Sequence, residues 1–554
     1  MAETESGLTN YDSSEVSSKY LADYSDEYRK SRFQTNMRRD IGWLGAFFVA
    51  AGVPALVLFS MGGISALDGP TAILVWTLSV TIGFIDAFVY AEIAGLHPKK
   101  SGGTAVHGAT AWIRYITPAA PISLWCNWLA WTPVLSIGSG LGAGYLLSIF
   151  YAPTAKINTW AVTLLNLNFL KTGLTLRLNA TFFIGAAIML VVWNVQHRGI
   201  LRTARIQTIL TVGTLAPLLI VSIVPIFTGD VVMKNFSPFV PINGHWNLSG
   251  WTLFLGGLFI AAWSAYAFET AICYMSEFKN PGRDQAKAIL WSGVFCIVCF
   301  ALVPFVFQGV LGTHRMATDP GIASGAGVGD ALAGMVHGAE WVTKILVVLL
   351  LFTLILAIMT AMSGSSRTLF QGGEDGWLPK YLSHLNEHKV PTYAMWTDLG
   401  VNLILLLMSD YIFVLAVSNC NYMIFNFLNL NAGWIHRKDN ARVPRPFKAP
   451  LPLFVLGTCM AYINAFLLGA GANAWGSGTL LAGWVSALIA IPVFYYRHLV
   501  TDKGQFPRHM FADLIPEGET ELGPKRCGIL PYVALAGGLA SMTLGYVIFW
   551  VWKP

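Results

Sequence analysis

The sequence predicts an all-α integral membrane protein, and its composition and its apolar runs both support this class. The chain has 554 residues, of which 55% are hydrophobic and 12% charged, and its mean hydropathy is +0.57. Charged residues make up roughly a quarter of a soluble globular domain. Apolar runs of about 20 residues, enough to cross a hydrocarbon core of roughly 30 Å, recur along almost the whole chain. Helices satisfy their own backbone hydrogen bonds in lipid, so we expect these runs to be helical.

Hydropathy predicts about thirteen transmembrane helices. Many of the 20 Trp and 19 Tyr residues lie at the ends of the apolar runs, as an interfacial aromatic belt would place them. The predicted spans are 41–66, 70–95, 119–150, 176–195, 205–228, 251–278, 286–311, 340–370, 392–409, 411–436, 451–472, 476–497 and 528–552, the last being a candidate additional C-terminal span. The polar residues 1–40 contain no apolar core with a small-residue cleavage site, so we expect a tail and not a signal peptide.

Basic residues between the spans predict which side faces the cytoplasm. The loops after the second, fourth, sixth, eighth and tenth spans carry Lys and Arg, and they lie on the side of the basic N-terminal tail. The opposite loops, such as 228–250 and 312–339, are rich in Gly, Ser and Asn and nearly free of Lys and Arg. By the positive-inside rule, the tail is cytoplasmic and the protein is a multi-pass protein of the plasma (inner) membrane.

The sequence lacks the patterns of several other function classes. Six of the seven cysteines lie inside apolar runs, and the pair Cys296 and Cys299 on a membrane helix indicates packing and not redox or metal chemistry. The basic residues form no single patch, so no nucleic-acid partner is expected. No nucleophile–base pair, phosphate loop or metal cluster is present, so we expect neither an enzyme nor a metal site. The Gly-rich stretch 321–334 follows no strand, and a flexible surface loop is expected there.

Two spans contain features that can interrupt a helix. The first span includes Gly52-Val53-Pro54-Ala55, where Pro54 removes a backbone donor and disfavours α geometry in the residue before it. The sixth span places Ser264, Tyr266 and Glu269 in an apolar run, although it has no Gly or Pro at its centre. Interrupted helices in corresponding positions of two halves mark the binding site of inverted-repeat transporters. A simple proline kink in the first span is the alternative.

Glu269 is an ionisable group within a membrane span. Such groups are costly in lipid, and they usually face a cavity or a partner on a substrate or ion route. If Glu269 meets a substrate ammonium or a coupling cation, it can link protonation to substrate binding or gating. The alternative is a buried acid that holds two helices together by hydrogen bonds.

Five motifs in order resemble those of the amino acid–polyamine–organocation permease superfamily. They are YAEIAGLHP at 90–98 with SGG at 101–103, NVQHRGILRTARIQTILTV at 194–212, WSAYAFE at 263–269 with EFKNPGRD at 277–284, GSSR at 364–367 with DGWLP at 375–379, and RPF at 445–447 with Pro450. Each motif is short, but five of them at matching helices make a specific match, which covers residues 41 to 450.

The resemblance implies the leucine-transporter-type fold, in which five helices repeat in inverted orientation. The repeats would be 41–228 and 251–436, with two peripheral helices in 451–497. In that family the substrate lies between the broken first and sixth helices, and the third, eighth and tenth close the cavity. The matching positions here are Gly52, Val53, Pro54, Ala55, Trp263, Ser264, Tyr266 and Glu269.

Trp263 stands where the family's arginine/agmatine antiporter has an aromatic residue that stacks on the charged side chain of its substrate. A cation over a Trp ring gains about 2 kcal/mol when it is desolvated. Ordinary helix packing is the alternative role for this residue.

The chain departs from the family pattern at two places. Amino-acid carriers often have Gly-Ser-Gly in the first helix, whose amides hold the substrate carboxylate, whereas this chain keeps only the N–H groups of Gly52, Val53 and Ala55 around Pro54. Some proton-coupled members have a lysine in helix five, and the aligned residue here is the neutral Thr214. Its hydroxyl could join a sodium site with Thr360 or Ser363, or the carrier could be an exchanger without a coupling ion.

Further polar residues lie within the spans. Asn419, Tyr422, Asn426 and Asn429 recur at three- and four-residue steps, so they share one helix face. Such a stripe forms either interhelical hydrogen bonds or a cavity lining, and hydrogen bonds between helices are expected for most of it, with Asn419 or Tyr422 as the cavity candidate. Ser136 is a further candidate substrate contact. Asp86 is expected to pair with a neighbouring helix or to relay protons.

Together these features predict a secondary active transporter that moves a small amino acid or organic amine across the plasma membrane by alternating access. Coupling to H⁺ or Na⁺ stays open, no other cofactor is expected, and the partners are the substrate and the lipid bilayer. Two alternatives remain. One is a carrier for a polyamine or other organocation without a carboxylate, and the other is a transporter-derived nutrient sensor that signals through the N-terminal tail.

Overall fold

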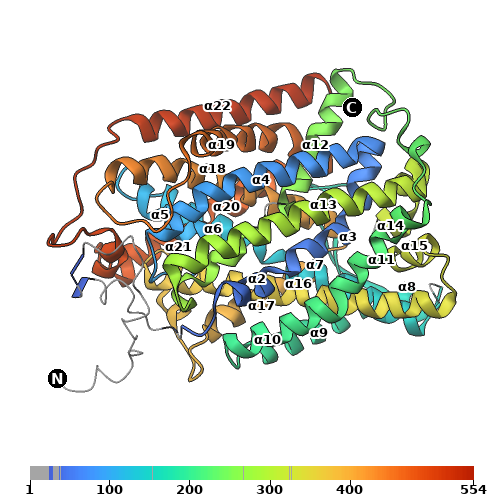
Figure 1. Cartoon of the computed structure of the whole chain (residues 1–554), viewed down its shortest axis with the longest axis horizontal. Coiled ribbons are helices and arrows are strands. Elements are labelled where there is room, and N and C mark those ends of the chain that lie inside the picture. Colours follow the sequence, from blue (N-terminus) through green and yellow to red (C-terminus); the bar gives the residue numbers. More distant parts are fainter. Residues whose placement is uncertain are drawn as a thin grey trace.

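A computed structural model describes residues 24–25, 27–28, 37, 39–152, 154–265, 267–323, 325 and 327–553. Long helices run side by side along the longest axis of the molecule (Figure 1). Within these residues a two-stranded hairpin is the only sheet. Ten helical stretches of the described chain are long and apolar enough to cross a membrane, and the shorter apolar helices Trp43–Leu58 and Ala180–Gln196 accompany them. The predicted all-α membrane class is confirmed.

The helices of the first half follow the predicted spans, with breaks inside three of them. In chain order they are α2 (Trp43–Ala50), α3 (Gly52–Asp68), the 3-10 turn η2 (Gly69–Thr71), α4 (Ala72–Gly95), α5 (Thr104–Trp112), α6 (Ala119–Trp131), α7 (Pro133–Phe150), α8 (Lys156–Thr159), α9 (Ala180–Gln196), α10 (Ile200–Leu210), the π-helix η3 (Thr211–Leu215) and α11 (Ala216–Thr228). The short helix α5, which the hydropathy does not predict, lies between the second and third spans.

The second half begins with the 3-10 turn η4 (Met233–Phe236) and ends with a helix near the C-terminus. Its elements are α12 (Leu248–Ala265), the 3-10 helix η5 (Ala267–Glu277), α13 (Pro281–Thr318), α14 (Pro320–Ala323), α15 (Val328–Met335), α16 (Glu340–Glu374), η6 (Lys380–Ser383), α17 (Thr392–Leu406), α18 (Tyr411–Asp439), α19 (Leu451–Gly471), η7 (Ala472–Trp475), α20 (Thr479–Leu488), α21 (Ala490–Tyr495), the π-helix η8 (Tyr496–Thr501), η9 (Arg508–Leu514) and α22 (Leu530–Val551).

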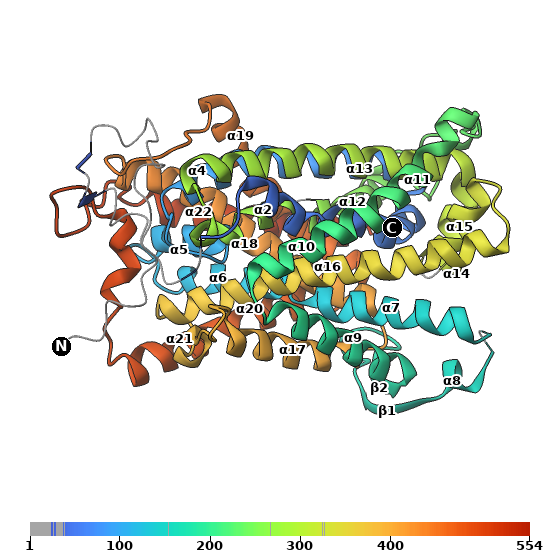
Figure 2. The same cartoon turned by 60° about the horizontal axis from the view of Figure 1, so that its bottom comes forward.

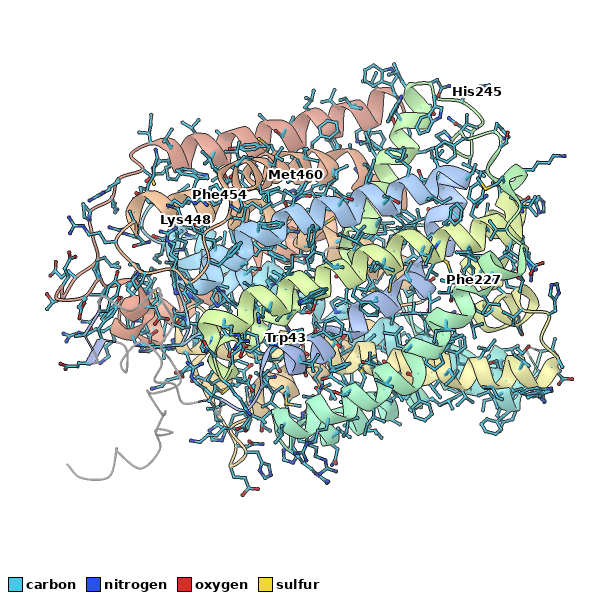
Figure 3. The ribbon with its side chains drawn as sticks, in the orientation of Figure 1. Trp43, Phe227, His245, Lys448, Phe454 and Met460 are labelled. Atoms are coloured by element: carbon cyan, nitrogen blue, oxygen red, sulfur yellow. The ribbon has the colours of Figure 1, made fainter. Side chains whose placement is uncertain are left out.

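The two ends of the bundle differ in what they carry. Residues 39–42, the turns after α4, α9, η5, α16 and α18, and the connection from η8 to α22 gather at one end, which we call the tail end (Figure 2). The hairpin, α8 and α15 lie at the opposite end, which we call the far end. Lys448 marks the tail end, and Phe227 and His245 mark the far end (Figure 3).

Two sequence-based expectations are wrong at the far end. The stretch 321–334, expected to be a flexible loop, contains α15, because Val328, Ala331 and Leu332 form a buried apolar face at helical spacing. The span predicted from residue 176 begins with a strand, since β1 (Ala161–Asn166) pairs with β2 (Thr175–Asn179) in antiparallel fashion. Helix α9 starts only after Asn179, whose side chain caps it by accepting from the Phe182 N–H at 2.9 Å.

Helix α22, at the candidate C-terminal span, packs along α19 through a seam of glycines (Figure 1). A Cβ added at Gly469 of α19 would lie 1.9 Å from the Met542 carbonyl oxygen, and one added at Gly545 of α22 would lie 2.3 Å from that of Phe466. Small residues let membrane helices approach backbone to backbone. Van der Waals contacts then hold the helices together, because the hydrophobic effect does not drive association between helices in lipid. These glycines therefore fix α22 against the bundle.

Buried ion pairs hold the tail end together. Arg367 of α16 pairs with Glu277 at the end of η5, and its second donor reaches the other carboxylate oxygen at 3.1 Å. Lys100 and Asp375 are 2.7 Å apart. The acid of the second span, Glu92, accepts from Arg437 and Arg445 at 2.5 and 2.7 Å. Four of the five sequence motifs thus meet through their charged residues at one end of the bundle.

The Arg367–Glu277 pair yields a prediction for stability. Arg367 and Glu277 are only 4% and 3% exposed, so Arg367→Met should leave a buried carboxylate without a partner and lower the free energy of unfolding by about 3–5 kcal/mol. Unfolding of the purified protein in detergent measures this loss. Adding Glu277→Gln should restore part of it, and Arg442→Met, which removes an exposed pair with Glu519, should have little effect. Equal losses in the two single variants would contradict a special role for the buried pair.

Candidate functional site

The first membrane helix is interrupted where the sequence predicts. Helix α2 ends at Ala50 and α3 begins at Gly52. Pro54 has no N–H with which to bond the Ala50 carbonyl, so the helical ladder cannot continue through this point. The nearby carbonyl oxygen of Val49 instead accepts hydrogen bonds from two side chains, Thr360 Oγ1 at 2.6 Å and Gln207 Nε2 at 3.1 Å. The break is therefore held by α16 and α10.

Gly52 allows α3 to lie directly against α16. A Cβ at this position would come within 2.8 Å of the Ala357 Cα and within 2.5 Å of the Thr360 hydroxyl oxygen. No side chain fits there without moving a helix backbone. Val53 and Ala55 are buried in the same turn, and the N–H groups of a first helical turn have no partner within their own helix. The donor role that the sequence assigns to positions 52, 53 and 55 around Pro54 stays a prediction.

The sixth span changes from α-helix to 3-10 helix in its middle. Helix α12 ends at Ala265 and η5 begins at Ala267. Tyr266, a predicted substrate contact, lies outside the described residues. The change of helix type falls inside the predicted motif WSAYAFE, so both interruptions occur at the positions that the sequence indicates.

Glu269 lies in the first turn of η5 and is 2% exposed. The Tyr422 hydroxyl of α18 donates to its Oε2 at 3.1 Å, whereas its Oε1 has no hydrogen-bond partner within the described chain. The ring of Trp131 from α6 packs edge-on against Tyr422, with centroids 5.6 Å apart. Glu269 is therefore a buried acid that keeps one acceptor available.

Trp263 is a buried link between three helices. Its indole N–H donates to the Ala130 carbonyl at 3.0 Å and to the Ser418 hydroxyl at 2.9 Å, so it ties α12 to α6 and α18. Ser264 donates weakly to the Ala261 carbonyl at 3.4 Å. These contacts favour the packing role for the Trp263 indole nitrogen and leave a stacking role for the ring face as a prediction.

The polar stripe of α18 bonds to a different element at each step. Asn419 donates to the Phe259 carbonyl of α12, Tyr422 to Glu269 of η5, and Asn429 to Ser123 of α6 at 3.1 Å, while Asn426 accepts from Tyr90 of α4. Of the two interpretations left open for this stripe, these bonds support interhelical contacts. The Asn419 Oδ1 atom stays without a partner among the described residues.

Asp86 of α4 is a second buried acid near the first. Both of its oxygens are buried without a hydrogen bond within the described residues, and the side chain of Asn464 on α19 lies beside it. It also lies close enough to Glu269 for their charges to interact. An acid that is buried without compensation in a membrane interior is expensive and marks a functional position.

The predicted sodium site differs from the structure. Thr214 in η3 accepts from Thr353 at 3.2 Å, and Thr353 precedes Thr360 by about two helical turns, roughly 10 Å along α16. The Thr360 hydroxyl also accepts from Gln207 at 3.2 Å, and the Ser363 hydroxyl accepts from Gln196 at 2.8 Å. The Thr214 hydroxyl therefore contacts Thr353 and not Thr360 or Ser363. The alignment gives only its position in the fifth span and not the direction of its side chain.

Ser136 makes no hydrogen bond with residues of the two breaks within the described chain, and its predicted substrate contact stays a prediction. Its backbone N–H donates to Asn402 of α17 at 3.1 Å, and its side chain borders a separate cavity at the far end. The residues that sequence reasoning missed are Gln196 and Gln207. Their signal was present, since each is a polar residue beside an apolar run within the motif at 194–212.

A family model described as amino acid permease matches residues 41–495, which is most of the chain. The chain belongs to the amino acid permease family. Family membership indicates a multi-pass membrane transporter of amino acids and not an enzyme, and it agrees with the resemblance seen in the five motifs.

Three permeases illustrate the similarity. The branched-chain amino acid permease BcaP of Lactococcus lactis subsp. cremoris is 24% identical over 424 residues, covering 73% of this permease and 85% of that protein. The lysine-specific permease LysP of the same organism is 25% identical over 479 residues, covering 80% and 85%. BcaP of Bacillus subtilis is 23% identical over 463 residues, covering 82% and 88%.

Gly52 gives a direct test of the first break. Gly52→Ala should force α3 away from α16, cost about 1–3 kcal/mol of stability and sharply lower the transport rate of this permease, because the Thr360–Val49 bond is disturbed. Thermal unfolding and uptake rates measure the two effects. The matched control is Gly63→Ala on the same helix, where the nearest atom to the new Cβ is 4.0 Å away. If the two variants behave alike, close packing at Gly52 is not required.

Proposed function

We propose that this permease is a secondary active carrier that moves a small amino acid or organic amine across the plasma membrane by alternating access. The observation that carries the proposal is the pair of interrupted helices, α2–α3 and α12–η5, with a buried acid beside the second. Interrupted helices expose backbone groups that a continuous helix would use internally.

The two breaks supply opposite partial charges for a zwitterion. The N-terminal turn of α3 offers the amides of Gly52, Val53 and Ala55, whose dipoles favour a substrate carboxylate. The C-terminal turn of α12, which ends at Ala265, offers carbonyl oxygens that favour a substrate ammonium. In this proposal Pro54 stops the ladder, and Trp263 and Ser264 hold the end of α12 in place.

Proton coupling fits the buried groups better than sodium coupling. Glu269 and Asp86 lie near each other inside the bundle, each with an acceptor that no described residue satisfies. Around Thr360 and Ser363, side-chain amides from Gln207 and Gln196 already donate to the hydroxyls that a sodium ion would need as ligands. We therefore assign coupling or gating to Glu269 and Asp86.

A carrier for an organocation without a carboxylate is the second candidate. Its specific support is the unpartnered Oε1 of Glu269, which offers an acceptor to a substrate ammonium. The two candidates differ in their need for the α3 amides, because only a substrate with a carboxylate uses them. Competition by putrescine against labelled leucine or lysine separates them.

Uptake into proteoliposomes tests the proposed function. With labelled leucine or lysine, an inward proton gradient should drive accumulation, and a sodium gradient should not. Glu269→Gln keeps the size and the bond from Tyr422, so it should fold and bind but lose most of the pH dependence of uptake. Binding without accumulation by the wild type would favour a sensor. An unchanged pH profile in Glu269→Gln would make this acid structural.

The proposed orientation, with the N-terminus in the cytoplasm, predicts a labelling pattern. Single cysteines replacing Arg198 or Lys438 at the tail end should react with an impermeant maleimide only from the cytoplasmic side, and those replacing Lys156 or Lys234 at the far end only from outside. All four side chains are exposed. Six of the native cysteines are buried, so a Cys459→Ser background should show little labelling of its own. Labelling of Lys156→Cys from the cytoplasm would overturn the orientation.

A further inference from the structure

A cavity of about 240 Å³ lies at the far end, between the hairpin and the third, fourth, ninth and tenth spans. Its lining residues come from α7, β2, the start of α9, α17 and the start of α18. Its volume is just below the roughly 300 Å³ at which pockets for drug-sized ligands begin. It therefore has room for a small headgroup and a short length of chain.

Arg177 supplies a charge to this cavity. Arg177 lines the cavity, and its guanidinium makes neither an ion pair nor a side-chain hydrogen bond with any residue that the structure describes. The backbone of Arg177 is anchored, because its N–H donates to the Leu407 carbonyl at 2.8 Å and Leu176 forms a bridge with Met408. An arginine on an anchored strand beside a cavity, without a counter-charge in the described chain, is suited to bind an anion.

The surroundings of Arg177 favour an anion further. None of the lining residues is acidic, and Thr181 and Ser409 are hydroxyl-bearing residues of the same lining. The first turn of the 17-residue helix α9 starts at the cavity, which adds the positive end of a helix dipole. The acid nearest in sequence, Asp410, is already engaged, since it pairs with Lys171 at 2.5 Å and caps α18.

The remaining wall of the cavity is apolar. Ile137 and Leu141 of α7 face Leu405 and Leu406 of α17, with Val414 of α18 closing the space. Gly140 and Gly144 keep the α7 side open. A cavity with a cationic residue at one end and an apolar wall matches an amphiphile, which has a charged headgroup and a hydrocarbon chain.

We propose that this cavity binds an anionic amphiphile, with a phosphate or carboxylate headgroup on Arg177 and an apolar chain between α7 and α17. The site is separate from the two helix breaks, and the proposal does not depend on which amino acid is carried. Two sources share this chemistry, an anionic phospholipid of the membrane and a soluble medium-chain carboxylate.

Native mass spectrometry of the full chain in detergent tests the site with phosphatidylglycerol, phosphatidylcholine and octanoate. The wild type should retain one phosphatidylglycerol at least about tenfold more strongly than phosphatidylcholine, and Arg177→Gln should abolish that preference. Arg177→Lys should keep part of it. Lys156→Gln removes an exposed charge from the same end and should behave like the wild type. Leu141→Trp fills the chain half and should weaken both anions even if Arg177→Gln does not fold.

The outcomes separate the two sources and decide the proposal. Retention of phosphatidylglycerol that depends on Arg177 assigns the site to a membrane lipid. Octanoate binding that depends on Arg177 and that phosphatidylglycerol does not displace assigns it to a soluble carboxylate. Equal retention of phosphatidylglycerol by wild type, Arg177→Gln and Leu141→Trp would overturn the proposal, as would equal retention of the two lipids by the wild type.

Discussion

A backbone carbonyl freed inside a membrane has to find a donor within the protein, and much of this structure follows from that requirement. The first helix is interrupted between Ala50 and Gly52, and the Val49 carbonyl beside this break accepts from Thr360 and Gln207. Those bonds require α16 and α10 to lie close to the break, which in turn requires the missing side chain of Gly52. The break in one membrane helix is thus held by polar side chains of two others.

The same requirement, that buried polar groups find partners within the protein, determines the contacts at the centre of the bundle. Each polar residue along one face of α18 contacts a different neighbour, so this helix connects α12, η5, α4 and α6 through side-chain bonds. Glu269 and Asp86 are buried acids near this helix with carboxylate oxygens that no described residue satisfies. Buried acids of this kind are where ligand or proton chemistry has room to act.

Much of the fold could be predicted because membrane helices are recognisable in a sequence as long apolar runs. The break at Gly52–Ala55 was visible because proline has a fixed local effect. The break after Ala265 was visible only through its motif, because no Gly or Pro stands there. Partners across helices were not predictable: the Thr214 hydroxyl and the Gln207 amide both lie on the fifth span, and only the packing decides which reaches Thr360. The hairpin was missed because Leu176 and Leu178 of β2 extend the apolar run of α9 toward its N-terminus.

The glycine seam between α19 and α22 has a consequence for how such carriers diversify. At Gly469 and Gly545 the two helices meet backbone to backbone, and at Gly537 the missing side chain leaves room for the Tyr462 ring of α19. Helix α22 also lies beyond the stretch that matches the family, which ends at residue 495. A peripheral helix attached in this way can be added or exchanged by a few glycine substitutions, so lineages can vary the rim of the carrier while its centre stays the same.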